Sequence, residues 1–116
     1  MAVTIGLRNV GPTTALSVGA TATTAISIAA AASNDWNGFT AFLNTGLTYV
    51  AVNIAPQGTA PAAVLPVGGT AQTVIMLPAS MTAPVVYSTP PGGFSMTAIG
   101  SAAGPSIIYI TPVAQN

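Results

Sequence analysis

The sequence predicts an all-β protein, with seven to nine short strands in a two-sheet β-sandwich or jelly-roll-like arrangement. Two observations lead to this prediction. Ten Pro and 12 Gly residues recur along the 116 residues and leave no room for a long helix. Between them lie short runs rich in Val, Ile, Thr and aromatic residues, as is typical of strands. In residues 49–54 apolar side chains alternate, so that Val50, Val52 and Ile54 share one face.

Turn residues set the boundaries of the expected strands. Gly68-Gly69 and Asn44-Thr45-Gly46 supply backbone conformations with positive φ at low steric cost. The Pro-Pro-Gly-Gly sequence at residues 90–93 excludes regular structure locally. We therefore expect strands at residues 14–18, 22–28, 39–43, 48–54, 62–65, 73–77, 94–99 and 106–111, with residues 3–7 as an additional edge strand.

Two segments leave alternatives open. Alanine is the best helix former, so residues 29–33 form either a short helical turn or part of the connection after the preceding strand. Residues 79–93 are too apolar for an idle surface loop and form either an interface loop or a further strand. Their large apolar side chains are Met81, Val85, Val86 and Tyr87.

An internal repeat is visible at a shift of 49 residues. Residues 15–28 (ALSVGATATTAISI) and 64–77 (VLPVGGTAQTVIML) are identical at seven of 14 positions. Downstream, residues 38–56 are matched by residues 93–112 at a shift of 55 to 56 residues. Gene duplication would give an internal two-fold pseudo-repeat, whereas the regular order of strands and turns in a β-sandwich explains the same pattern without duplication.

The chain length is sufficient for one core. We predict a single β-sandwich domain over residues 1–116. Residues 1–12 are expected to form an extended N-terminal arm, which either reaches onto a neighbouring molecule or frays.

Charge is nearly absent, and this excludes most functions. Arg8 and Asp35 are the only charged residues, and the chain has no Lys, Glu, His or Cys. Catalysis and metal binding draw on clusters of these residue types. We therefore predict a protein that is not an enzyme, without catalytic, cofactor-binding or metal-binding residues and without a small-molecule substrate. One Arg cannot neutralise a phosphate backbone, so we expect no nucleic-acid partner.

High apolar content alone does not predict a membrane protein. The mean hydropathy is +0.71, and residues 9–34 carry no charge. This stretch nevertheless consists mainly of Ala, Thr, Ser and Gly, whereas Leu, Ile, Phe and Val drive membrane insertion. We expect no membrane partner. High hydrophobicity with no net charge also opposes disorder.

A surface without charges favours association. No strand after Asp35 carries a charged residue that would protect a sheet edge, so we expect a homo-oligomer or a component of a larger assembly. Trp36 is either a binding hot spot or a ring that caps the core. Arg8 and Asp35 either form an ion pair or are separately solvated. The candidate interface residues are Arg8, Asp35, Trp36, Val85, Val86 and Tyr87.

Several short motifs resemble those of small virion proteins of tailed bacteriophages. They lie within residues 38–116 and comprise Asn44-Thr45-Gly46, Tyr49-Val50-Ala51-Val52, Leu65-Pro66-Val67-Gly68-Gly69, Leu77-Pro78, Ala98-Ile99-Gly100-Ser101 and Tyr109-Ile110-Thr111-Pro112. The resemblance implies a β-sandwich subunit that decorates or cements a capsid. It also implies trimers as the favoured oligomer. The family has no catalytic residues that could be assigned to this sequence.

The same resemblance implies the major capsid protein or other virion subunits as partners, the capsid surface as location, and synthesis in the host cytoplasm. Contacts made by apolar burial and backbone hydrogen bonds would suit a chain without charges. Two alternative functions are a tail, fibre or host-surface recognition module, and a bacterial surface or pilus subunit.

Overall fold

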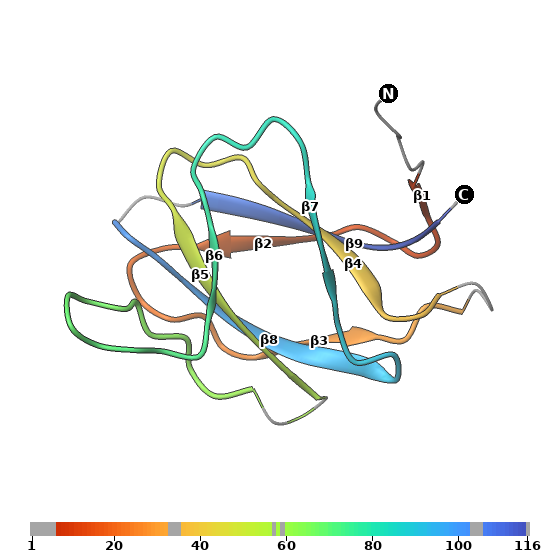
Figure 1. Ribbon diagram of the computed structural model, residues 1–116, viewed down its shortest axis with the longest axis horizontal. Helices are drawn as coiled ribbons and strands as arrows, with labels where there is room; N and C mark the ends of the chain where they lie inside the picture. Colours follow the sequence, from red (N-terminus) through yellow and green to blue (C-terminus); the bar gives the residue numbers. More distant parts are fainter. Residues whose placement is uncertain (1–6, 33–35, 57, 59, 103–105, 116) are drawn as a thin grey trace.

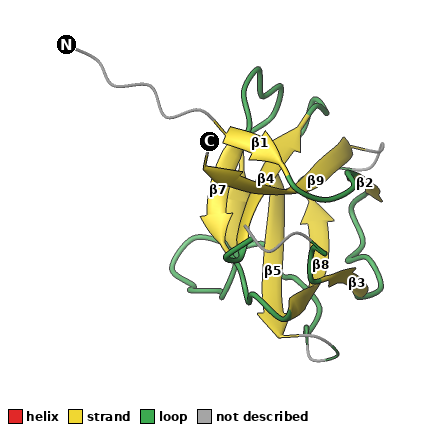
Figure 2. Cartoon of the chain, turned by 90° about the vertical axis from the view of Figure 1, so that its right-hand side faces the viewer, coloured by secondary structure: helices red, strands yellow, loops and turns green. Residues whose placement is uncertain are grey.

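Two antiparallel sheets pack face to face as a sandwich (Figures 1 and 2), which confirms the predicted fold class. The computed structural model describes residues 7–32, 36–56, 58, 60–102 and 106–115, and over these residues it contains nine strands and no helix. In chain order the strands are β1 (Leu7–Asn9), β2 (Thr14–Val18), β3 (Ile26–Ala29), β4 (Phe39–Asn44), β5 (Val50–Pro56), β6 (Ile75–Leu77), β7 (Val85–Ser88), β8 (Gly93–Gly100) and β9 (Ser106–Gln115).

Strand β9 organises the first sheet, which we call sheet 1. β4 pairs with one edge of β9, and β7 pairs with the far edge of β4. The other edge of β9 is shared by two strands, because β2 pairs with its residues 106–110 and β1 with its residues 113–115. The second sheet, sheet 2, has the order β3-β8-β5-β6.

Eight of the strands are nested as one long hairpin. β5 pairs with β6, β4 with β7, β3 with β8 and β2 with β9, so successive pairs join segments progressively farther apart in the chain. Two further pairings, of β4 with β9 and of β5 with β8, complete the two layers. This connectivity is that of a jelly roll.

Alternating side chains from both sheets fill the core. Val50 and Val52 of β5 are buried and Ile54 is half-buried, as their shared face predicts. Deeply buried aromatic rings come from both layers, Phe42 from sheet 1 and Phe94 from sheet 2. The full core cluster comprises Val18, Ile28, Phe42, Val50, Val52, Leu77, Phe94, Met96, Ala98, Ile108 and Ile110.

Seven of the eight expected strands are present, and β2 has the predicted bounds. β3 begins four residues later than predicted, because the preceding segment contacts β8 differently. The Thr23 N–H donates to the Ala98 carbonyl at 2.9 Å, and the Thr23 hydroxyl accepts from the Ala98 N–H at 3.0 Å. The Thr23 side chain thus accepts the hydrogen bond that a backbone carbonyl of a paired strand would accept from Ala98. Residues 30–32 form no helical turn, and Ser33 lies outside the described residues.

The expected strand at residues 62–65 is absent, so that prediction was wrong. The neighbouring Pro61 carbonyl accepts hydrogen bonds from Asn53 and Thr97 of sheet 2, and Ala63 is buried. The segment therefore packs on a sheet face instead of pairing within a sheet. Conversely, residues 79–93 do contain a strand, β7. Of the predicted strand at residues 3–7, residues 3–6 lie outside the described residues, and β1 begins at Leu7.

The sequence repeat does not become a structural repeat. Residues 15–18 lie in β2, whereas their counterparts at residues 64–67 lie outside any strand. In the second copy, β7 stands between β6 and β8. Regular succession of strands and turns therefore explains the repeat better than two equivalent halves do.

Asn44 holds the turn between β4 and β5 together from inside. Its buried side-chain amide donates to the carbonyls of Thr48 at 2.9 Å and Pro78 at 3.0 Å, and its side-chain oxygen accepts from the Gly46 N–H at 3.0 Å. Gly46 does not have the positive φ that we expected. It is required because a Cβ there would lie 2.6 Å from the Cα of Ser106.

We predict that Gly46→Ala lowers the free energy of unfolding by about 1–3 kcal/mol, because its methyl group would overlap the Ser106 backbone. Gly68→Ala is the matched control, since no atom lies within 4 Å of its Cβ position and its φ is not positive. The control should change stability by less than about 1 kcal/mol. Urea unfolding followed by circular dichroism measures both, and equal effects would contradict the close approach.

Asn44→Asp should lower the free energy of unfolding by about 3 kcal/mol, since a charged acceptor would face the Thr48 and Pro78 carbonyls in a buried site. Thr45→Ala removes an exposed hydroxyl one residue away and should cost less than about 1 kcal/mol. The same unfolding experiment compares them. Similar stability of the two variants would show that the Asn44 hydrogen bonds do not hold this turn.

Candidate interaction surfaces

The outward side of sheet 1 is an extended apolar surface, which we call the sheet 1 face. Of the nine large hydrophobic residues exposed among those described, four lie on it: Phe39 at 42%, Ile107 at 38%, and Val86 and Tyr109 at 37% each. A contiguous apolar patch of this kind marks an interaction site in soluble proteins. The outward-pointing residues are Ala15, Ser17, Phe39, Ala41, Leu43, Val86, Ser88, Ile107, Tyr109 and Thr111.

On the outward side of sheet 2, the two central strands β5 and β8 are partly covered by the chain itself. Thr97 and Asn53 donate to the Pro61 carbonyl at 2.6 and 3.3 Å, and Ser95 accepts from the Gly58 N–H at 2.6 Å. All three side chains are buried by this crossing segment. The two faces of the sandwich thus differ, because sheet 2 presents polar groups to an internal cover whereas sheet 1 presents apolar groups outward.

A second set of exposed apolar side chains lies at loop tips. Leu47, in the loop between β4 and β5, is 90% exposed, and Tyr49 follows it at 49%. Val64 and Val67, in the long connection between β5 and β6, are 48% and 66% exposed. We call these four residues the apolar loop tips. The ninth exposed residue, Met76, lies on the outward side of sheet 2.

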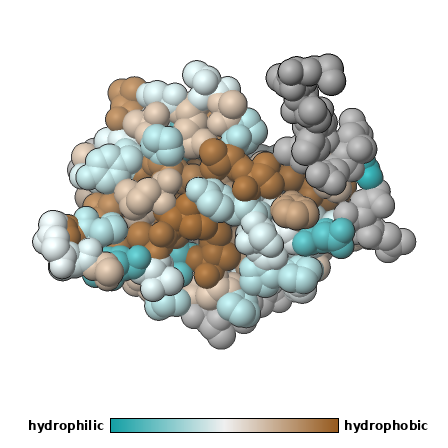
Figure 3. Space-filling view, in the orientation of Figure 1, coloured by the Kyte–Doolittle hydropathy of each residue, from teal (hydrophilic) through white to brown (hydrophobic). Residues whose placement is uncertain are grey.

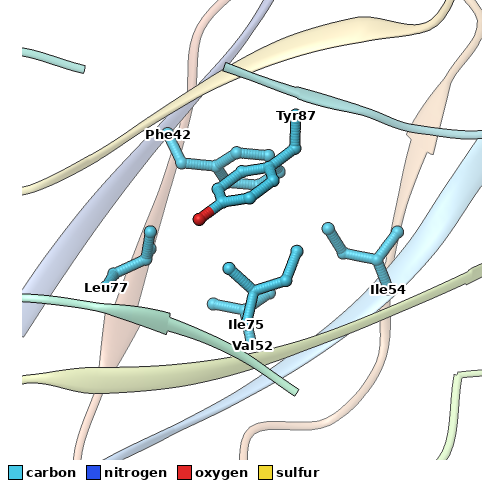
Figure 4. Close-up of a pocket in the computed structure, with 6 residues that line it drawn as sticks. All are labelled: Phe42, Val52, Ile54, Ile75, Leu77 and Tyr87. Atoms are coloured by element: carbon cyan, nitrogen blue, oxygen red, sulfur yellow. The ribbon is translucent and has the colours of Figure 1, made fainter. Parts of the chain in front are cut away.

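An apolar seam runs between β6 and β7, which lie alongside each other at the open edges of the two sheets (Figure 1). The hydrophobic colour in Figure 3 forms a band across this region. Beneath it lies a hollow too small to admit a water molecule (Figure 4), where the rings of Phe42 and Tyr87 meet edge to face at a centroid distance of 6.0 Å. The lining residues are Phe42, Val52, Ile54, Ile75, Leu77 and Tyr87.

This hollow has the character of a packing gap. Ligand pockets typically enclose 300–1,000 Å³ and converge several polar groups on the ligand. Here the Tyr87 hydroxyl is the single polar side-chain group among the lining residues. The seam therefore offers neither the volume nor the chemistry of a small-molecule site.

The predicted interface residues do not form one cluster. Trp36 is buried, and its indole N–H donates to the Phe39 carbonyl at 2.8 Å, as expected for a ring that caps the core. Val85 and Tyr87 point inward and pack against the core cluster. Val86 points outward and belongs to the sheet 1 face.

Arg8, the charged residue in the described part of the chain, lies outside these surfaces. Arg8 is exposed in β1, opposite Ala114 of β9. Since Ala114 alternates with the outward residues of β9, Arg8 does not point into the sheet 1 face. Asp35 lies outside the described residues, so both alternatives for the two charges, an ion pair or separate solvation, stay predictions.

Sequence reasoning missed Phe39, Ile107, Tyr109 and Leu47 as surface residues. Alternation does separate Ile107 and Tyr109 from Ile108 and Ile110, but both pairs are apolar. Either side of this strand could therefore have been the core side. The packing of Ile108 and Ile110 in the core cluster decides the question.

Comparison with known proteins adds no family assignment. No protein-family model, curated protein or solved structure matches the chain. Among the residues that the structure describes, no helix is long and apolar enough to cross a membrane.

We predict that Trp36→Phe lowers the free energy of unfolding by about 1–3 kcal/mol, because it leaves the Phe39 carbonyl without its indole donor and opens a gap in the core. Tyr49→Phe changes an exposed aromatic side chain and should have almost no effect. Chemical unfolding monitored by circular dichroism compares the variants. Unchanged stability in Trp36→Phe would favour the binding interpretation of this residue.

Proposed function

We propose that this protein is a non-enzymatic structural subunit of a virion, which decorates or cements the capsid of a tailed bacteriophage. Its partners are the major capsid protein or other virion subunits, together with further copies of itself. The contacts form by apolar burial and backbone hydrogen bonding across the seams of the shell.

The observation that supports this proposal most directly is the combination of exposed apolar groups with almost no charge. Eight large hydrophobic residues are exposed on the sheet 1 face and at the apolar loop tips, while Arg8 is the one charged residue in the described part of the chain. A free soluble protein normally separates such groups with charged side chains. A subunit whose surfaces are covered in an assembly does not need them.

Two further observations agree with this function. Jelly-roll connectivity recurs in viral capsid proteins, although the same fold also serves lectins and many enzymes. The turn motif Asn44-Thr45-Gly46, part of the resemblance to phage virion proteins, is built into the β4–β5 turn by the Asn44 hydrogen bonds. The fold thus supports the proposal only together with the surface.

Recognition of a host glycan is the main alternative, and it depends on exposed aromatic rings. Trp36 is buried and Tyr87 packs inward, so neither of these two candidate interface residues presents its ring to a glycan. The apolar shell subunit therefore accounts for more of the exposed surface than a glycan-binding module does.

Purified particles from the source of this sequence test the proposal. We expect the chain to cosediment with capsids at both about 0.1 and about 1 M NaCl, because apolar contacts are little affected by ionic screening. Antibody labelling in electron microscopy should place it on the head. Absence from the particles, labelling of the tail alone, or release by salt would each contradict the proposal.

Leu47→Lys tests whether the apolar loop tips contact the shell. The side chain is 90% exposed, so the substitution should leave stability unchanged, but it places a charge in an apolar contact. We expect at least tenfold weaker rebinding to stripped capsids, with a loss of about 1.4 kcal/mol or more. Gln72→Lys adds the same charge at another exposed loop position and should bind normally. Equal binding by both variants would remove Leu47 from the contact.

A further inference from the structure

We propose that a second copy of this chain covers the sheet 1 face, with the two faces related by a two-fold axis. This contact between copies is independent of any capsid and assigns one of the two apolar surfaces to self-association. It leaves the apolar loop tips for other partners.

The chemistry of the face selects an uncharged occupant. None of its outward residues is charged, and Arg8 alternates away from it. A partner that brought a charged group would lose that group's hydration without gaining a counter-charge. An identical face brings only the apolar groups and hydroxyls that this surface already presents.

Sheet geometry also favours a copy of the same sheet. Two sheets pack aligned when their twists match, at an angle near −30° and a spacing of about 10 Å. Two copies of sheet 1 have the same twist. A two-fold axis then makes every contact occur twice, as in most protein dimers.

The pattern of large and small side chains on the face is self-complementary. One cross-strand row contains the bulky pair Tyr109 and Leu43, which lie opposite each other. The next row contains the smaller pair Thr111 and Ala41. A two-fold axis that runs parallel to these rows and between them reverses the order of the rows in the second copy. Tyr109 and Leu43 of each copy then lie over the small row of the other.

The flanking rows fit the same axis. Ile107 lies in the row beyond Tyr109, next to Thr45, whose N–H donates to the Ile107 carbonyl at 3.2 Å. Phe39 lies in the row beyond Ala41, opposite Ser88. The rotation brings the row of Ile107 over the row of Phe39. The exposed side chains at both ends of the face are thereby buried in one operation.

The size of the face sets the expected affinity. Four strands about 4.8 Å apart and seven residues of about 3.4 Å rise cover roughly 19 by 24 Å, or about 450 Å² per copy. The pair buries about 900 Å², near the lower limit for specific interfaces. The contact should therefore be weak in dilute solution and favoured at the high local concentration of an assembly.

Sedimentation velocity of the isolated full chain tests the pairing. Between about 5 and about 500 µM, we expect a reversible monomer–dimer equilibrium with a dissociation constant in this range. It should be the same at about 0.05 and about 1 M NaCl. A monomer at all concentrations, or a trimer without a dimer, would overturn the two-fold pairing. This measurement does not involve capsids. Its failure would therefore leave the proposed capsid association to the cosedimentation experiment.

Charged substitutions locate the contact. Val86→Lys and Ile107→Lys should each raise the dissociation constant at least tenfold, because the new charges are buried in an apolar interface. Ser27→Lys puts the same charge on an exposed position of sheet 2 and should leave it unchanged. Val86 lies on an edge strand, so the Val86→Lys variant should fold even if Ile107→Lys does not. Circular dichroism and unfolding midpoints verify folding. Loss of dimers in Leu47→Lys with normal dimers in Val86→Lys would overturn the assignment.

Discussion

Neutral hydrogen bonding is the constraint on which this structure depends. With one basic and one acidic residue in the chain, buried polar groups cannot rely on ion pairs. Within the described residues, every buried side-chain nitrogen and oxygen nevertheless has a hydrogen-bond partner. Neutral hydrogen bonds depend on close geometry, and the Asn44 amide shows how the chain provides it. Its three partners position the β4–β5 turn, whose Gly46 then fits against Ser106.

The same constraint explains how much of the fold could be predicted from the sequence. Strand positions follow from β-rich segments bounded by Gly and Pro, and most are correct. The wrong predictions concern segments whose backbone groups form hydrogen bonds without pairing as a strand in either sheet. The Thr23 side chain replaces strand pairing with Ala98. Residues 62–65 lie against a sheet face because Asn53 and Thr97 hold Pro61 there. Such contacts between distant segments have no local sequence signal.

The candidate surfaces were harder to predict, for a different physical reason. Alternation assigns Ile107 and Tyr109 to one side of β9 and Ile108 and Ile110 to the other, but hydrophobicity does not distinguish the two sides. In an ordinary soluble domain the outward side would be polar. Here both sides are apolar, and this ambiguity is itself the evidence for a covered face. By contrast, the inward and outward roles of Val85, Val86 and Tyr87 follow at once when these residues are recognised as a strand.

The central place of β9 also determines when the protein can fold during synthesis. β1, β2 and β4 all pair with β9, although about 60 to 100 residues of chain separate them from it. Loop closure over such distances is slow, as expected for folds dominated by non-local pairing. Until β9 leaves the ribosome, these three strands lack their shared partner, and of the strand pairs described in sheet 1 that of β4 with β7 alone can form. Sheet 1 therefore cannot be completed before β9 has been synthesised, and the nascent chain must avoid aggregation until then.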